Sequence, residues 1–139
     1  MLIQLTTDAI DVSEALQEVR HPSCGAVATF EGDIRESNQG KSVRGLEYEV
    51  YEGLFHNVVR QIIEELKSRW TIHEIALIQR VGKLKVGDLG IVISVSSAHR
   101  RDALEALSYA IEEFKKRAPV WKKESTLEGD EWINWSSQT

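Results

Sequence analysis

The sequence predicts an α+β fold with a mixed or antiparallel sheet and about three helices. Three segments repeat apolar residues at the spacing of an amphipathic helix, and runs of β-favouring residues lie between them. The chain has 139 residues, two prolines (Pro22 and Pro119) and no low-complexity linker or repeat. We therefore expect one domain spanning residues 1–139.

The first two elements are a short strand and a short helix. Residues 2–6 are expected to form the strand. Asp11 can cap a helix over residues 12–20. That helix should end at His21-Pro22, because proline disfavours helical backbone in the residue before it.

Two strands and a long helix follow. Residues 25–32 are small or β-favouring, and residues 33–41 form a polar loop after them. Residues 43–51 alternate apolar and polar side chains, as a strand with one buried face does. An amphipathic helix is expected over residues 54–69, and its apolar stripe consists of Leu54, Val58, Val59, Ile62, Ile63 and Leu66.

The last part of the chain alternates strands with one more helix. Residues 72–81 are expected to form a strand. Residues 83–88 should form a shorter strand and a turn. Residues 89–97 are strongly apolar, which is typical of a central strand. The last helix is expected over residues 101–116, with Leu104, Leu107, Ile111 and Phe114 on one face. Short strands over residues 121–126 and 131–133 should flank a turn at residues 128–130.

Composition excludes several classes of protein. No apolar run reaches the ~18 residues that cross a bilayer, and residues 1–5 do not resemble a signal peptide. Cys24 is the only cysteine, so a disulfide within the chain is impossible, and we expect the reducing cytoplasm. The formal net charge of -5 argues against non-specific nucleic-acid binding, although a local basic pocket remains compatible with it.

The most informative segment is basic. Five cations, and no acid, occur in the nine residues from Lys115 to Lys123. Lys115 lies in the last turn of the predicted helix, and Pro119 makes Ala118 extended, so the chain turns back and the amines of Lys115 and Lys122 can meet. A lysine among cations loses its proton more easily and can act as a nucleophile or a proton-transfer group. The alternative is that these cations only favour the dipole at the helix end.

A second polar segment precedes the same helix. His99, Arg100 and the hydroxyls of Ser96 and Ser97 can donate to an anion at the helix start, or they can simply form a solvated helix entry. The helix is about 22 Å long, so its two ends cannot line one compact site. Either the site is elongated or a second subunit completes it.

Other chemistry has less support. Arg35, in the polar loop, can bind phosphate in a fork geometry or be an ordinary exposed arginine. The four histidines show no paired ligand spacing, and one cysteine cannot build a thiolate metal site. We therefore expect no metal.

Several motifs together resemble the family of molybdopterin synthase catalytic (large) subunits. The motifs are Gly25-Ala26-Val27-Ala28-Thr29-Phe30-Glu31-Gly32 with Arg35, Leu46-Glu47-Tyr48-Glu49, Arg80-Val81-Gly82-Lys83-Leu84, Val86-Gly87-Asp88, Ser97-Ala98-His99-Arg100, Lys115-Lys116-Arg117-Ala118-Pro119-Val120-Trp121-Lys122-Lys123-Glu124, and Glu128-Gly129-Asp130 with Trp132. They cover nearly the whole chain in order. The last two long motifs are highly specific in combination.

The resemblance implies an α/β-hammerhead fold and a sulfurtransferase that needs no metal or organic cofactor. The family converts cyclic pyranopterin monophosphate (precursor Z) to molybdopterin in molybdenum cofactor biosynthesis. Sulfur comes from the C-terminal Gly-Gly thiocarboxylate of a small ubiquitin-like subunit. Two large subunits form a central homodimer within a heterotetramer that carries one small subunit at each end.

The resemblance also implies roles for individual residues. The catalytic residues are Lys115, beside the thiocarboxylate tail, and Lys122. The substrate-binding residues are Arg35, His99, Arg100, Lys115, Lys122, Lys123 and Glu124, with His99 and Arg100 at the phosphate. A second hypothesis is a non-catalytic binding module, in which the cations only dock a ubiquitin-like partner. Such a surface would not need His99 and Arg100 together with Arg35, and this feature separates the two hypotheses.

Overall fold

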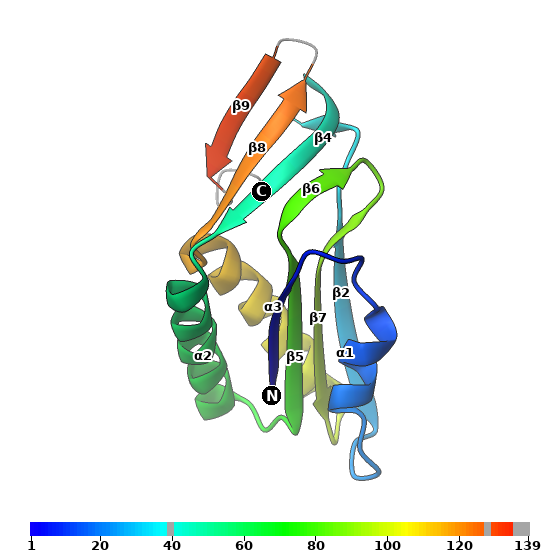
Figure 1. Ribbon diagram of the computed structural model, residues 1–139. Coiled ribbons are helices and arrows are strands. Elements are labelled where there is room, and N and C mark those ends of the chain that lie inside the picture. The colour runs from blue at the N-terminus through cyan, green and yellow to red at the C-terminus, as the bar shows by residue number, and fades with distance from the viewer. Residues whose placement is uncertain (39–40, 127–128, 135–139) are drawn as a thin grey trace.

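The computed structural model describes residues 1–38, 41–126 and 129–134, and it has the α+β architecture that the sequence predicts (Figure 1). In this part of the chain the helices are α1 (Val12–Val19), α2 (Glu52–Arg69) and α3 (Arg100–Arg117). The strands are β1 (Leu2–Thr6), β2 (Ala26–Asp33), β3 (Ser37–Asn38), β4 (Lys41–Val50), β5 (Glu74–Arg80), β6 (Gly82–Lys85), β7 (Leu89–Ser97), β8 (Val120–Thr126) and β9 (Gly129–Asn134). Within the described residues, no helix is both long and apolar enough to cross a membrane.

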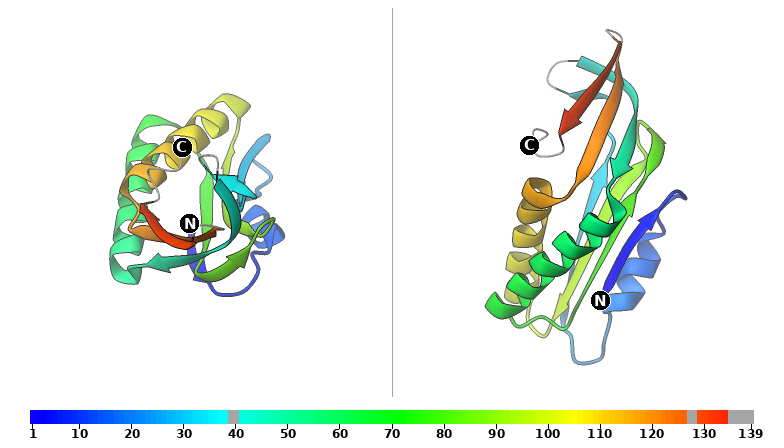
Figure 2. Two further views of the ribbon diagram at one scale, coloured as in Figure 1. Left: turned by 90° about the horizontal axis from the view of Figure 1, so that it is seen from above. Right: turned by 60° about the vertical axis from the view of Figure 1, so that its left-hand side comes forward.

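The first sheet has the strand order β1-β5-β7-β2. β1 is parallel to β5, and the other pairs are antiparallel, so the sheet is mixed. One face is covered by α2 and α3 and the other by α1, as the right-hand view of Figure 2 shows. Both faces of β7 are therefore buried, which explains its unbroken apolar sequence and confirms it as a central strand.

The second sheet is antiparallel and has the order β3-β4-β8-β9, with β6 paired to β4. It lies above the first sheet in Figure 1, and β8 enters it directly from the end of α3. Leu46 and Tyr48 of β4 and Val120 of β8 are buried on its inner face. The sequence predicted a loop over residues 33–41, which is wrong at Ser37–Asn38, because these residues form β3 and pair with β4, and at the two ends, where Asp33 belongs to β2 and Lys41 to β4.

The buried faces of two helices differ from the expected stripes. In α2, Phe55 is fully buried, whereas Leu54 is 56% exposed. In α3 the face toward the sheet includes Ala103, Ala106 and Ala110, and Leu104 is 57% exposed. Small alanine side chains let α3 approach β2 and β7 closely, so the largest apolar residues do not by themselves mark the contact face.

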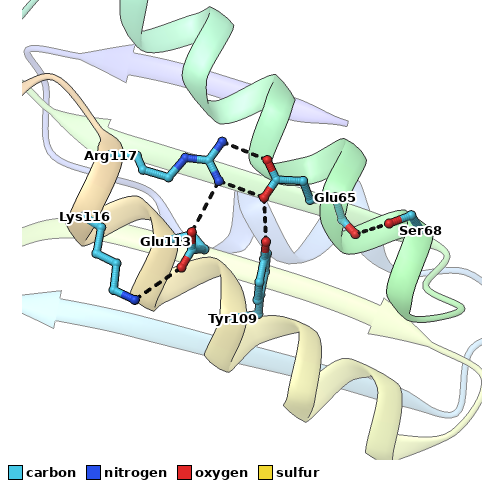
Figure 3. Close-up of polar contacts among 6 residues, drawn as sticks. All are labelled: Glu65, Ser68, Tyr109, Glu113, Lys116 and Arg117. Carbon is cyan, nitrogen blue, oxygen red and sulfur yellow. Dashed lines mark hydrogen bonds and ion pairs between the residues drawn. The ribbon is translucent and has the colours of Figure 1, made fainter.

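A polar cluster joins the exposed sides of α2 and α3 (Figure 3). Arg117 donates from Nη1 and Nη2 to the two carboxylate oxygens of Glu65, at 2.7 and 2.8 Å. The hydroxyl of Tyr109 donates to the same carboxylate at 2.5 Å, and Glu113 lies 3.4 Å from Arg117. These contacts fix α3 against α2 at the end that leads into β8.

Replacing Glu65 by glutamine is expected to lower the melting temperature near neutral pH by a few degrees at most, because the pair is only half-buried. The hydrogen bond from Arg117 lowers the pKa of Glu65 from 4.5 to about 2. A carboxylate with a depressed pKa stabilises the fold above its unfolded pKa and loses this effect as the pH falls.

The difference in melting temperature between wild type and Glu65→Gln should therefore be full above pH 4.5 and shrink as the pH falls toward 2. Thermal melts followed by circular dichroism across this range measure it. Glu112→Gln, which removes an exposed carboxylate from α3, is the matched control and should show no such pH dependence. A difference in melting temperature that stays constant down to pH 2 would contradict the lowered pKa of Glu65.

Candidate active site

The end of α3 and the start of β8 form a sharp corner. The N–H of Ala118 donates to the carbonyl of Phe114 at 2.9 Å and ends the helix, and Ala118 is extended with ψ at 134°. The N–H of Val120 then donates back to the Ala118 carbonyl at 2.8 Å across Pro119. This corner places Lys115 on the last helical turn and Lys122 on the strand that follows, as the sequence predicted.

Lys122 and Glu124 form a buried ion pair on the inner face of β8. Their charged atoms are 3.4 Å apart, and the side chains are only 10% and 3% exposed. Burial lowers the pKa of Lys122, Glu124 opposes this effect, and the charges of Arg35 and Lys115 lower the pKa further. The charges of Arg35 and Lys115 therefore both act on Lys122.

Tyr48 lies beside this pair and was not identified from the sequence as a site residue. It is directly opposite Lys122 in the β4–β8 register, and it is only 4% exposed. Burial and the neighbouring Glu124 charge raise the pKa of its hydroxyl, so Tyr48 stays neutral. Gly90 leaves room for it, since a Cβ there would lie 3.2 Å from the Tyr48 oxygen. Only the strand register reveals this neighbour.

The loop after β2 presents Arg35 to the site. The N–H of Ile34 donates to the Asp88 carbonyl at 2.9 Å, and the Ile34 carbonyl accepts from the N–H of Gly87 at 2.8 Å. Ile34 is itself buried, so the loop is held firmly while Arg35 stays exposed. The site thus combines the cations of Arg35, Lys115 and Lys122 with the carboxylate of Glu124, which leaves two positive charges in excess.

Lys123 lies on the opposite face of β8 from Lys122 and Glu124, because successive strand side chains alternate. Its register partner on β4 is Glu47, so two opposite charges are adjacent on the outer face of the second sheet. The family resemblance implies substrate binding for three consecutive residues, of which Lys122 and Glu124 lie on the inner face and Lys123 does not.

His99 and Arg100 lie at the other end of α3. His99 precedes the first helical residue, Arg100, and both are exposed. The helix has 18 residues and is therefore about 27 Å long. His99 and Arg100 are consequently remote from Lys115 in the same chain, which leaves the two sequence alternatives of an elongated site or a second subunit.

The nearby serines, which the sequence left as either donors to an anion or part of a solvated helix entry, are inaccessible to an anion. Ser96 and Ser97 are both fully buried. The Ser97 hydroxyl donates to the His99 carbonyl at 2.5 Å and accepts from the N–H of Ala103 at 3.1 Å. It therefore caps α3 and has no O–H left to donate to an anion. Among the described residues, no group of three histidine, cysteine or acidic side chains could hold a metal ion.

Removing the charge of Glu124 is expected to destabilise the protein. Glu124→Gln leaves the buried ammonium of Lys122 without its counter-ion and should cost about 3 kcal/mol of unfolding free energy. The double variant Lys122→Met with Glu124→Gln should recover part of this loss, because it removes the unpaired charge. Urea unfolding measures both, and Glu47→Gln on the outer face of β4 is the control. A double variant less stable than Glu124→Gln would argue against a buried ion pair.

Three comparisons place the chain among known proteins. A family model described as MoaE protein matches residues 5–117. The chain is 44% identical over 134 residues to molybdopterin synthase catalytic subunit 2 of Aedes aegypti, a match that covers 96% of this chain and 86% of that protein. The crystal structure of molybdopterin synthase from Staphylococcus aureus is similar with a TM-score of 0.88 and 33% identity, covering 93% of this chain and 94% of that one.

A second solved structure supports the fold alone. It is the protein–protein complex of subunits 1 and 2 of molybdopterin-converting factor from Helicobacter pylori, with a TM-score of 0.78 and 22% identity. The match covers 94% of this chain and 88% of that chain.

Proposed function

The chain belongs to the MoaE family of molybdopterin synthase catalytic subunits, and from this premise we propose that it transfers sulfur to cyclic pyranopterin monophosphate. Family membership makes it a transferase of molybdenum cofactor biosynthesis. The sulfur donor in our proposal is the C-terminal thiocarboxylate of a small ubiquitin-like subunit, and the compartment is the cytoplasm. In each transfer one carbon–sulfur bond forms on the pterin as a carbon–oxygen bond of the same carbon breaks. Water then cleaves the acyl–sulfur bond and leaves the tail as a carboxylate, and two transfers complete the dithiolene.

The observation that carries this proposal is the positive inner site. Lys122 pairs with the buried carboxylate of Glu124, and the charges of Arg35 and Lys115 act on Lys122. The substrate phosphate and the thiocarboxylate are both anions. A cation that is partly desolvated, as Lys122 is, stabilises such groups more than a fully exposed one would. The tail of a ubiquitin-like subunit is narrow and extended, so it can reach a site at the corner between α3 and β8.

The proposed roles follow from position. Lys115, on the last turn of α3, assists sulfur transfer beside the thiocarboxylate. Lys122 has a depressed pKa and is a second proton-transfer group, with Glu124 holding its ammonium in place. Arg35 binds an anionic oxygen of the substrate. Lys123 contributes only positive potential from the outer face.

The phosphate is bound, in our proposal, by His99 and Arg100 of a second copy of the chain. The length of α3 separates these residues from Lys115 within one chain. In a homodimer, a two-fold axis can bring the start of one α3 to the site at the end of the other. The complete assembly is then a homodimer with one small subunit bound at each site.

A reconstitution assay tests the function directly. The purified chain is mixed with thiocarboxylated small subunit and cyclic pyranopterin monophosphate, and molybdopterin is detected by mass spectrometry. Product should form only when all three components are present. Absence of product, in a preparation where the same small subunit supports another family member, would overturn the proposal.

The binding-module hypothesis is tested by titrating cyclic pyranopterin monophosphate against the chain alone. The enzyme hypothesis predicts saturable binding that weakens with added salt and with Arg35→Ala. A chain that binds the small subunit but shows no saturable pterin binding, even at low salt, would support the module instead.

A further inference from the structure

Arg117 lies between the two lysines of the candidate active site and is held by a different helix. Its guanidinium meets the carboxylate of Glu65 with two parallel hydrogen bonds of 2.7 and 2.8 Å (Figure 3). The hydroxyl of Tyr109 donates to the same carboxylate, and Glu113 completes the arrangement from the turn of α3 before Arg117. A bidentate pair of this kind fixes an orientation as well as a distance.

Two further contacts connect α2 and the residue before it to the corner between α3 and β8. The N–H of Tyr51, which precedes α2, donates to the Pro119 carbonyl at 3.3 Å. Phe55 packs edge-on against Phe114, with ring centroids 5.9 Å apart. Lys115 lies between Phe114 and Arg117, so the residues on both sides of it are anchored to α2.

This arrangement adds little to global stability. The side chains of Arg117 and Glu65 are 29% and 38% exposed, and ion pairs this open to solvent contribute little to the free energy of unfolding. The geometry instead restricts how the last turn of α3 can rotate or fray. That turn carries Lys115 and determines where its amine lies relative to Lys122.

We infer that Arg117, which is held by its bidentate ion pair with Glu65, is a positioning residue for Lys115 in sulfur transfer. The inference rests on the proposed function and goes beyond it, because Arg117 acts through Lys115 and touches no substrate. Displacement of a catalytic group by about 1 Å can cost on the order of 100-fold in rate. Loss of the Arg117–Glu65 ion pair should therefore slow the chemical step and leave substrate binding largely intact.

The experiment measures kcat and KM for Arg117→Lys, Glu65→Gln and the double variant, well below their melting temperatures. Arg117→Lys keeps the charge but loses the fork geometry. Each single change should lower kcat about 10- to 100-fold, with KM for the pterin and for the small subunit within about twofold of wild type. The double variant should be no slower than the slower single variant, because the two residues act as one unit.

Lys116→Met is the matched control. Lys116 is on the same helical turn, also forms an ion pair with Glu113, and is 67% exposed. Its kcat should stay within about twofold of wild type. An unchanged kcat in Arg117→Lys, an equal loss in the control, or a rise in KM without a fall in kcat would overturn the positioning role. An inactive wild-type protein would instead overturn the proposed function.

Discussion

Replacing Lys115 by alanine is expected to lower the rate of molybdopterin formation at least about 1,000-fold. Loss of a catalytic amine removes both its charge beside the thiocarboxylate and its ability to exchange a proton or attack a carbonyl. The fold should survive, because alanine is the best helix former and Lys115 is only half-buried. Single-turnover assays with thiocarboxylated small subunit measure the loss, and mass spectrometry follows the thiocarboxylate that remains.

Two controls make this result specific to Lys115. Lys116→Ala removes a neighbouring cation from the exposed side of α3 and should leave turnover within about twofold. Circular dichroism and size-exclusion chromatography should show that Lys115→Ala keeps its secondary structure and oligomeric state. Normal turnover by a folded Lys115→Ala protein would remove Lys115 from the catalytic machinery.

The sequence predicted most strands and the ends of the helices because local patterns determine them. The apolar run at residues 89–97 marks a strand buried on both faces, and Pro119 marks the end of α3. The helical faces were less predictable. Leu104 is more hydrophobic than Ala103, but the sheet selects small residues where a helix approaches it closely, and this selection depends on tertiary packing.

The site was predictable where it is local in sequence. Lys115 and Lys122 flank one corner, and Pro119 alone predicted that corner. The separation of Lys122 from Lys123 depends on which face of β8 is buried, and the position of Tyr48 depends on the β4–β8 register. Neither can be read from one segment. The ion pair of Glu65 with Arg117 joins residues that are 52 positions apart, and no sequence pattern predicts it.

The proposed site requires His99 and Arg100 to act together with Lys115, although they lie at opposite ends of α3. An 18-residue helix separates them rigidly, and bending it would break its hydrogen bonds and its packing on β2 and β7. A compact site that contains both ends must therefore draw them from two chains. This requirement can be tested without locating the dimer interface.

Two inactive variants are expected to restore activity when they share one dimer. Lys115→Ala and Arg100→Ala chains carry different affinity tags, are co-expressed, and their heterodimer is isolated by two purifications. If each site takes Lys115 from one chain and Arg100 from the other, one of its two sites carries both changes and the other carries neither. The heterodimer should then show about half the wild-type rate per dimer, while each homodimer is nearly inactive.

The reciprocal control pairs a wild-type chain with a chain that carries both changes. In this control each of the two sites carries one of the two substitutions, so activity should be lost. The opposite pattern, with an inactive first heterodimer and a half-active control, would place Lys115 and Arg100 of one chain in the same site.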